Sequence, residues 1–180
     1  MRLIIFDGDE TLWHGLDGGN ISDNGDGDYI DSNDYEFSCP PGTDSDIILR
    51  NDGKRLQLFP ETRAVLREMR GREVLVALWT YNHPNPTHRA LAAWNIADQF
   101  DHVEAAWNPN KEQMLRNILT ATNVQPMDAV FIDDDPGRGH RQQAERVGIR
   151  FLKRGTDVTD LHQVLELVGD DEPITLEPLS

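Results

Sequence analysis

Short hydrophobic runs alternate with amphipathic segments along most of the chain. The runs, typical of buried strands, lie at 3–6, 74–79, 103–106, 129–132 and 149–152, the third being the weakest. Apolar residues at helical spacing predict helices at 60–71, 86–94, 112–119, 142–147 and 160–168, with Pro60 in the first turn of its helix. Strands that alternate with helices predict a parallel sheet covered on both faces, which is a three-layer, doubly wound α/β fold.

One segment interrupts this alternation. Residues 14–57, directly after the first strand, are rich in Gly, Asn and Ser and include the turn-forming run Cys39-Pro40-Pro41-Gly42. They predict a long insertion, either a mobile flap or a few short strands. No repeat and no linker divides two cores, so we expect one domain over 1–168 and a surface tail at 169–180.

The charge of the chain is strongly negative and concentrated in the insertion. Its 180 residues include 32 Asp and Glu but only 17 Lys and Arg, giving a net charge of −15. Nine acidic residues and no basic ones fall between His14 and Asp46: Asp17, Asp23, Asp26, Asp28, Asp31, Asp34, Glu36, Asp44 and Asp46. This field repels polyanions, so we expect no binding to nucleic acid or to an anionic membrane.

Several classes of protein are excluded by the same composition. A single cysteine, Cys39, cannot form an internal disulfide or a multi-cysteine metal site. The chain reaches Asp7 after four apolar residues, too few for a signal peptide, and has no apolar stretch of the length that spans a membrane. We therefore expect a cytoplasmic protein.

Polar side chains collect where the predicted strands end. They are Asp7 and Asp9, Thr80, Tyr81 and Asn82, Lys111 at a helix start, and Asp133 and Asp134. Because the carboxyl ends of parallel strands form one edge of the sheet, these side chains are expected to meet there. Crowded carboxylates repel one another unless a cation lies among them, and oxygen ligands suit Mg²⁺. A hydroxyl and a lysine beside the metal would bind phosphate oxygens, which indicates phosphoryl transfer.

The stretch Phe6-Asp7-Gly8-Asp9-Glu10-Thr11-Leu12 resembles the first motif of the haloacid dehalogenase superfamily, and Thr80, Lys111 and Asp133-Asp134 follow in the order of the other three. Trp13 after the first motif, Leu58-Phe59-Pro60-Glu61 and the double Asp resemble the magnesium-dependent phosphatase-1 group most closely. The resemblance covers about residues 2–12 and 56–168.

This resemblance implies a Mg²⁺-dependent phosphatase that hydrolyses a phosphomonoester through an aspartyl-phosphate. Asp7 would be the nucleophile and a metal ligand, and Asp9 the general acid/base, with its carbonyl on the metal. Thr80 and Lys111 would bind phosphate. Asp134 is the first choice for the direct metal ligand of the last motif, supported by Asp133.

Two departures from these relatives bear on the substrate. Tyr81 stands where they tend to have Arg, so either Asn82 supplies that contact or the substrate differs. The acidic insertion is absent from the compact relatives, so their substrate preference does not transfer. A small phosphorylated molecule and a phosphoprotein both remain candidate substrates, and the sequence leaves the oligomeric state open.

Other readings of these features stay open. A phosphotransferase, a non-catalytic binding protein or a phospho-receiver domain would use similar residues, although a receiver has its acidic pair early and its lysine last. The insertion is either a flap that selects cationic or polyhydroxyl substrates or a solvated loop, and its Asp spacing does not match a calcium loop. Alternatively, the excess of Asp reflects a high-salt cytoplasm. We expect surface positions for His83, His88 and His140, core positions for Trp79 and Trp94, and a pocket lining from Trp13 and Trp107.

Overall fold

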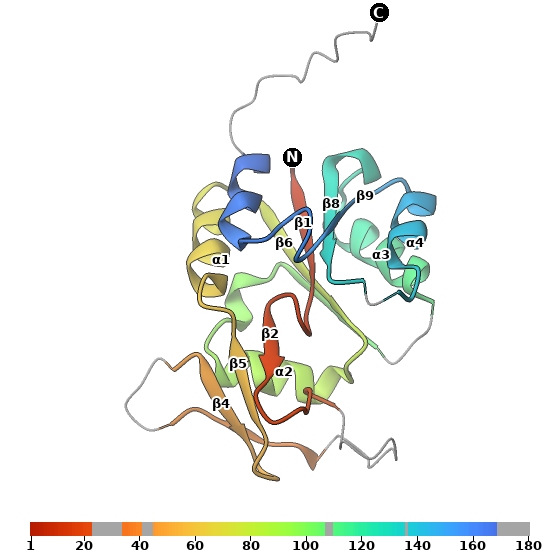
Figure 1. The fold of residues 1–180 in the computed structure, drawn as a ribbon. Coiled ribbons are helices and arrows are strands. Elements are labelled where there is room, and N and C mark those ends of the chain that lie inside the picture. Colours follow the sequence, from red (N-terminus) through yellow and green to blue (C-terminus); the bar gives the residue numbers. More distant parts are fainter. Residues whose placement is uncertain (23–33, 41–44, 107–109, 136, 169–180) are drawn as a thin grey trace, which may run out of the picture.

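A five-stranded parallel sheet forms the centre of the molecule (Figure 1). The structure, a computed structural model, describes residues 1–22, 34–40, 45–106, 110–135 and 137–168. The strands are β1 (Leu3–Asp7), β6 (Leu75–Thr80), β7 (His102–Ala105), β8 (Ala129–Asp133) and β9 (Arg150–Lys153). Their order, β7-β6-β1-β8-β9, places β1 in the middle, and all five predicted strands are confirmed.

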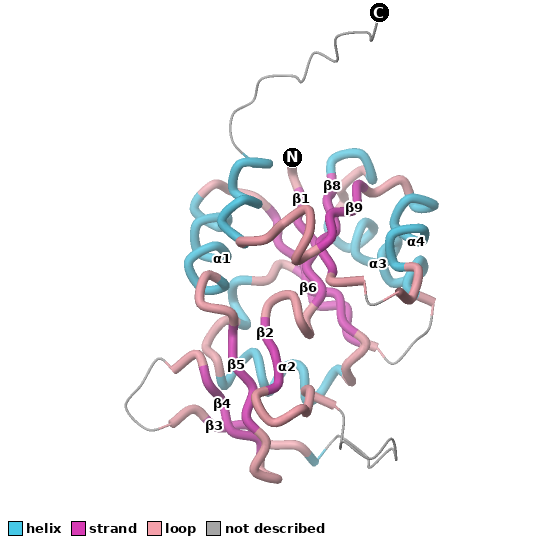
Figure 2. Tube along the Cα trace, viewed as in Figure 1, coloured by secondary structure: helices cyan, strands magenta, loops and turns pink. Residues whose placement is uncertain are grey.

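Alternate residues of β1 supply the two faces of the sheet with hydrophobic side chains. Ile4 and Phe6 pack with α1 (Thr62–Gly71), α2 (Pro84–Ala93) and the 3-10 helix η4 (Leu161–Val168). Leu3 and Ile5 pack with α3 (Lys111–Thr122) and α4 (His140–Val147) on the other face. Figure 2 shows α1 on one side of the sheet and α3 and α4 on the other. The predicted three-layer α/β fold is therefore present.

Two details of the predicted helices are wrong. Helix α1 begins at Thr62, so Pro60 lies in the preceding turn rather than in the helix. That turn is fixed by the carbonyl of Leu12, which accepts hydrogen bonds from the Phe59 N–H and the Thr62 hydroxyl. The segment at 161–168 is a 3-10 helix, and the Gln163 side chain accepts N–H groups just ahead of it. Short 3-10 turns also form at Ala97–Gln99 (η2) and Pro126–Asp128 (η3).

The described part of the insertion forms a second, antiparallel sheet. Its strands are β2 (Trp13–Gly15), β3 (Phe37–Ser38), β4 (Ile47–Arg50) and β5 (Arg55–Leu58), in the order β2-β5-β4-β3. Of the two predicted alternatives, a mobile flap or a few short strands, the described part of the insertion forms short strands. Residues 23–33 and 41–44, which include Asp23, Asp26, Asp28, Asp31 and Asp44, lie outside the described residues. In Figure 1 this sheet lies beyond the carboxyl ends of the parallel strands.

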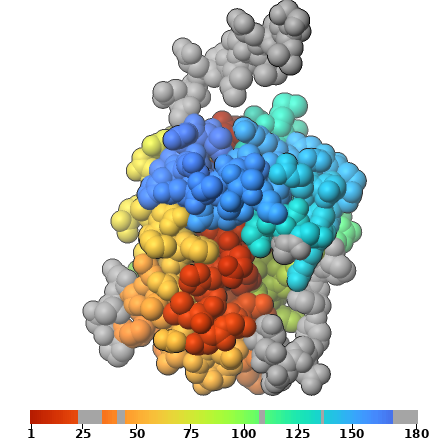
Figure 3. Space-filling view, viewed as in Figure 1, coloured from red at the N-terminus to blue at the C-terminus, as the bar shows by residue number. Residues whose placement is uncertain are grey.

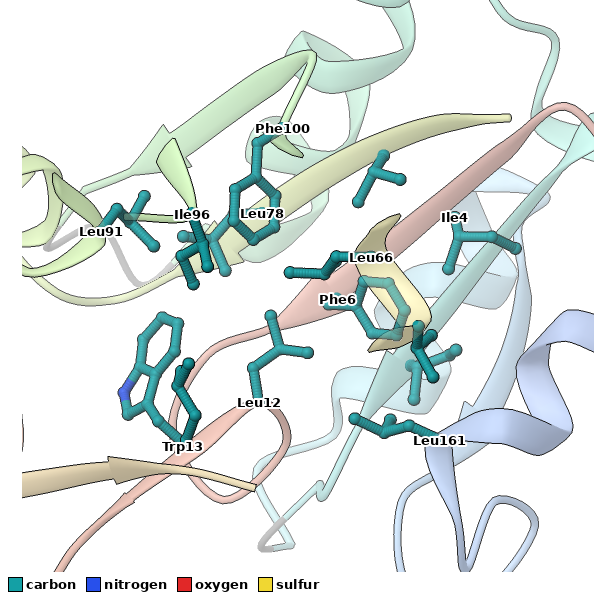
Figure 4. Packing of buried hydrophobic residues seen from close by; sticks show 14 of the residues in the cluster. Ile4, Phe6, Leu12, Trp13, Leu66, Leu78, Leu91, Ile96, Phe100 and Leu161 are labelled. Atoms are coloured by element: carbon teal, nitrogen blue, oxygen red, sulfur yellow. The ribbon is translucent and has the colours of Figure 1, made fainter. Parts of the chain in front are cut away.

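The second sheet is joined to the core by apolar packing and by arginines. Leu12 and Trp13 belong to the same buried cluster as Phe6 and Leu66, and Figure 4 shows them side by side in its interior. Arg63 of α1 donates to the Asp46 carboxylate and to the carbonyls of Ser45 and Trp94. This burial and bonding fix the described strands against the parallel sheet rather than leaving them as a loose loop.

No helix in the described part of the chain is long and apolar enough to cross a membrane. The expected C-terminal tail, 169–180, lies outside the described residues.

Candidate active site

A tight turn after β1 presents Asp7 and Asp9 at the sheet edge. The carbonyl of Gly8 accepts the N–H groups of Thr11, Leu12 and Trp13, and Glu10 has a left-handed φ of 58°. A Cβ on Gly8 would lie 2.2 Å from the Trp13 ring, so only glycine permits this approach. In Figure 3 part of the N-terminal segment is visible at the surface between the insertion and the C-terminal part of the chain.

Three carboxylates meet at the ends of β1 and β8. Asp7, Asp133 and Asp134 each offer an oxygen within 4.8 Å of the others. Asp133 is fully buried and accepts hydrogen bonds from the Asp135 N–H, at 2.5 Å, and the His140 ring. The Asp7 and Asp134 carboxylates have no hydrogen-bond partner within the described residues. These two are therefore the carboxylates left available to a ligand.

The electrostatics of the three carboxylates differ. Burial, followed by the charge of Asp133, raises the pKa of Asp7 well above its usual value. The same two causes raise the pKa of Asp134 to about 6. Burial acts in the same direction on Asp133, but the His140 hydrogen bond and the Lys111 charge outweigh it and lower its pKa. A hard divalent cation such as Mg²⁺ binds clustered oxygen ligands of this kind and compensates their negative charge.

Asp9 is held by two donors from different elements. Its Oδ1 accepts the Trp13 indole N–H at 2.9 Å, and its Oδ2 accepts the Asn82 amide at 2.6 Å. The same amide donates to the Thr80 hydroxyl at 2.9 Å. Burial raises the pKa of Asp9, while the hydrogen bonds from Trp13 and Asn82 oppose that shift. Burial therefore favours the protonated form of this carboxyl group, and the two donors fix its orientation.

Lys111 is enclosed by charged and aromatic groups. Its side chain is almost fully buried, and Nζ lies 3.5 Å from Asp133 Oδ2. The same nitrogen lies 3.2 Å from the centre of the Trp79 ring and 4.2 Å from that of Tyr81. Burial lowers the pKa of Lys111 to about 8, although Asp7 and Asp133 oppose the shift. Burial also raises the pKa of Tyr81 to about 12, so its phenol stays protonated.

The structure brings the predicted site residues to one edge of the parallel sheet, in two connected groups. Asp7, Asp133, Asp134, Lys111 and Tyr81 form one group, and Asp9, Asn82 and Thr80 form the other. Asn82 contacts Asp9 and Thr80, so it supports these side chains directly.

His140 is the residue that the sequence misplaced. It is 3% exposed rather than on the surface, and its Nδ1 lies 2.9 Å from Lys111 Nζ. Its position as the first residue of the helix after β8 was an available signal, because such helix starts lie at the same sheet edge. Trp79 and Trp94 are buried as predicted, Trp13 is a buried hydrogen-bond donor to Asp9, and Trp107 lies outside the described residues.

No protein-family model and no curated protein sequence matches the chain. Among solved structures, it is similar to a HAD-superfamily hydrolase, subfamily IA, variant 1, from Geobacter sulfurreducens, with a TM-score of 0.63 and 13% identity over 94% of this chain and 97% of the other. The chain is also similar to a HAD-superfamily hydrolase from Ehrlichia chaffeensis, with a TM-score of 0.63 and 15% identity over 93% of this chain and 97% of the other.

A third similar structure is the N-terminal part of a Bacteroides fragilis protein that contains a phosphatase domain and is complexed with Mg. It gives a TM-score of 0.60 and 19% identity over 93% of this chain but only 40% of the other. At these identities the comparisons establish the fold: this chain has the α/β fold of haloacid dehalogenase-type hydrolases.

Proposed function

We propose that this protein is a Mg²⁺-dependent phosphatase that hydrolyses a phosphomonoester through an aspartyl-phosphate on Asp7. The observation that carries the proposal is the pair of carboxylates on Asp7 and Asp134, adjacent and without hydrogen-bond partners among the described residues, beside the buried ammonium of Lys111. The fold of hydrolases and of a phosphatase domain complexed with Mg supports it. Within that fold, we propose the magnesium-dependent phosphatase-1 group as the nearest relatives.

The donor set suits magnesium. Asp7 and Asp134 would be direct ligands, joined by the Asp9 carbonyl, while Asp133 would support them because its own oxygens are engaged by Asp135, His140 and Lys111. When bound, the metal supplies charge neutralisation and orientation of a phosphate oxygen. Lys111 and the Thr80 hydroxyl would contact the remaining phosphate oxygens.

In the first step, an Asp7 carboxylate oxygen attacks phosphorus and the bond from phosphorus to the substrate oxygen breaks. Asp9 gives its proton to that leaving oxygen, so the alcohol departs neutral. Burial raises the pKa of Asp9, which favours the protonated form that this transfer needs, and Trp13 and Asn82 fix the orientation of the carboxyl group.

In the second step, Asp9, now ionised, takes a proton from water. The water oxygen attacks phosphorus, and the bond between phosphorus and the Asp7 oxygen breaks, which releases phosphate and restores the Asp7 carboxylate and the protonated Asp9. Asp7 thus returns to its initial state, which distinguishes turnover from stable phosphorylation.

The topology weighs against a phospho-receiver domain. Counted along the chain, the parallel strands have the order 3-2-1-4-5, whereas receiver domains have the order 2-1-3-4-5. A small phosphorylated molecule or a phosphoprotein would be the substrate, and a phosphotransferase would differ only in the acceptor of the second step.

Asp7→Asn tests the proposal directly. We expect it to abolish Mg²⁺-dependent hydrolysis of p-nitrophenyl phosphate, since an amide cannot form the acyl-phosphate, while the circular dichroism spectrum stays unchanged. Asp160→Asn is the matched control, because this exposed carboxylate is hydrogen-bonded to His162 in its own turn and is not one of the carboxylates of the cluster. Full activity in the Asp7 variant would refute the mechanism.

A further inference from the structure

His140 joins two charged groups of the site through a single ring nitrogen. Its Nδ1 lies 2.8 Å from Asp133 Oδ2, 3.0 Å from Oδ1 and 2.9 Å from Lys111 Nζ. The ring is buried, and its Nε2 has no hydrogen-bond partner among the described residues. All of the polar contacts of this imidazole in the described structure are therefore directed at Asp133 and Lys111.

The chemistry of these groups fixes the direction of the hydrogen bond. An ionised carboxylate only accepts, and an ammonium only donates, so Nδ1 cannot satisfy both at once. Asp133 has both oxygens around Nδ1, whereas Lys111 also has Asp133 and two aromatic rings as partners. The arrangement is satisfied when Nδ1 carries the hydrogen and donates it to Asp133.

The surrounding chain holds the imidazole in one orientation. The backbone N–H of His140 bonds to Asp135 Oδ1 at 3.3 Å, and Gly139 turns the chain into α4 with a φ of 78°. The ring packs edge-on against Trp79, with centres 5.7 Å apart, and against Tyr81 at 6.1 Å. The same two rings lie under the Lys111 ammonium, so the histidine, the lysine and the aromatic side chains form one packed unit.

We propose that His140 is a positioning residue of this site: its Nδ1–H fixes the Asp133 carboxylate, which in turn holds Lys111 beside Asp7. This inference rests on the proposed phosphatase function for its kinetic consequences. The Asp135 N–H is bonded to Oδ1 of Asp133, whereas Oδ2 accepts from His140, so removal of the imidazole donor leaves Oδ2 with only the 3.5 Å contact to Lys111 among the described residues. Removal of an outer-shell hydrogen-bond partner at a metal site typically lowers metal affinity or activity 10–100-fold.

Three substitutions separate positioning from space filling. In His140→Asn, the amide nitrogen occupies the place of Nδ1 and still donates to Asp133. His140→Gln places its amide near the position of Nε2, and His140→Leu has no donor. We expect the His140→Asn variant to keep kcat within about threefold of wild type. The Gln and Leu variants should lower kcat roughly 10–100-fold with little change in KM. A purely structural role predicts the opposite order, because Leu fills the buried space best.

Titration of each variant with Mg²⁺ in a calorimeter provides a readout that does not need turnover. We expect the apparent Mg²⁺ affinity to fall in the Gln and Leu variants but not in Asn. His162→Leu is the control, since His162 makes the same Nδ1 contact with a carboxylate, Asp160 at 2.8 Å, but on the exposed surface. It should leave kcat and the Mg²⁺ affinity unchanged.

The outcomes distinguish the two proposals. If the wild type is active and the kcat of His140→Leu equals or exceeds that of His140→Asn, the positioning role is overturned and the proposed phosphatase function stands. If the wild type hydrolyses no phosphate ester, the proposed function is overturned. If His140→Asn then still binds Mg²⁺ more tightly than His140→Leu, the positioning role is supported. If the Leu variant does not fold, the comparison of Asn with Gln decides.

Discussion

The carboxylate cluster predicts that Mg²⁺ stabilises this protein more at pH 7 than at pH 5. The folded-state pKa of Asp134 is about 6, above its ordinary value of 3.8. A carboxyl group with a raised folded pKa contributes stability that is complete below the unfolded pKa and is lost as pH rises through the folded one. Metal-free protein should therefore lose stability between pH 5 and pH 7, and Mg²⁺ should restore it by pairing with the exposed negative charge.

The size of this effect follows from the shift at Asp134. About two pKa units at 1.36 kcal/mol each correspond to about 3 kcal/mol over the whole titration, and a little under half of this, about 1.3 kcal/mol, falls between pH 5 and pH 7. Because Asp134 is partly exposed, solvent screening reduces this to about 0.7 kcal/mol. For a domain of this size that is roughly 1–3 °C in Tm. Asp7 and Asp9 act in the same direction, whereas Asp133, with a lowered pKa, changes only at lower pH.

Thermal unfolding measured at pH 5 and pH 7, in EDTA and in Mg²⁺, tests the argument. Asp134→Asn is the informative variant, because an amide does not titrate and is a weaker ligand. It should flatten the pH dependence of the metal-free Tm by about 1–3 °C and reduce the Mg²⁺-induced increase. An equal Mg²⁺ effect at the two pH values, or an unchanged pH dependence in the variant, would show that the cluster is not linked to the metal.

Two further predictions concern the contacts around the site. Trp13→Phe keeps an aromatic ring in place but removes the N–H that donates to Asp9, so kcat for an aryl phosphate should fall roughly tenfold with KM nearly constant. Steady-state kinetics measures this, and an unchanged kcat would contradict it. Arg63→Met removes the donors to Asp46 and Ser45 that join the insertion to α1, and the donor to the Trp94 carbonyl after α2, so the free energy of unfolding in urea should fall by about 2 kcal/mol. A value within about 0.5 kcal/mol of wild type would mean that apolar packing alone holds the second sheet.

The parallel sheet and the residues at its edge were predictable because the signals are local. Residues 3–6 and 129–132 are continuous apolar runs, and each ends in a carboxylate at the sheet edge. The second sheet was less predictable, since β2 and β3 are only three and two residues long and give no measurable periodicity. Its stability comes from long-range partners, such as Arg63 on Asp46, that sequence order does not reveal.

His140 was missed for a related reason. Its burial depends on a loop with left-handed glycines at 137 and 139, which returns the chain to the edge it has just left. The sequence reasoning used a helix start to place Lys111 but did not apply the same rule to α4. Trp13 was expected to line a pocket, and only the tight turn at Gly8 shows that its indole reaches back to Asp9.

The acidity of the chain comprises two kinds of carboxylate, which composition alone cannot separate. In the insertion, Asp17 pairs with Arg55, Asp46 with Arg63 and Glu36 with Arg89. Hydrogen bonds from Arg55 lower the pKa of Asp17 to about 2, so this exposed charge is stable without a metal. At the sheet edge, burial raises the pKa of Asp7, Asp9 and Asp134, and the basic side chains that contact the cluster within the described residues, Lys111 and His140, both contact Asp133. Arginine-paired carboxylates have their charge already compensated, whereas Asp7 and Asp134 have no such partner within the described residues. This difference is why we assign a structural role to the first group and propose a metal-binding role for the second.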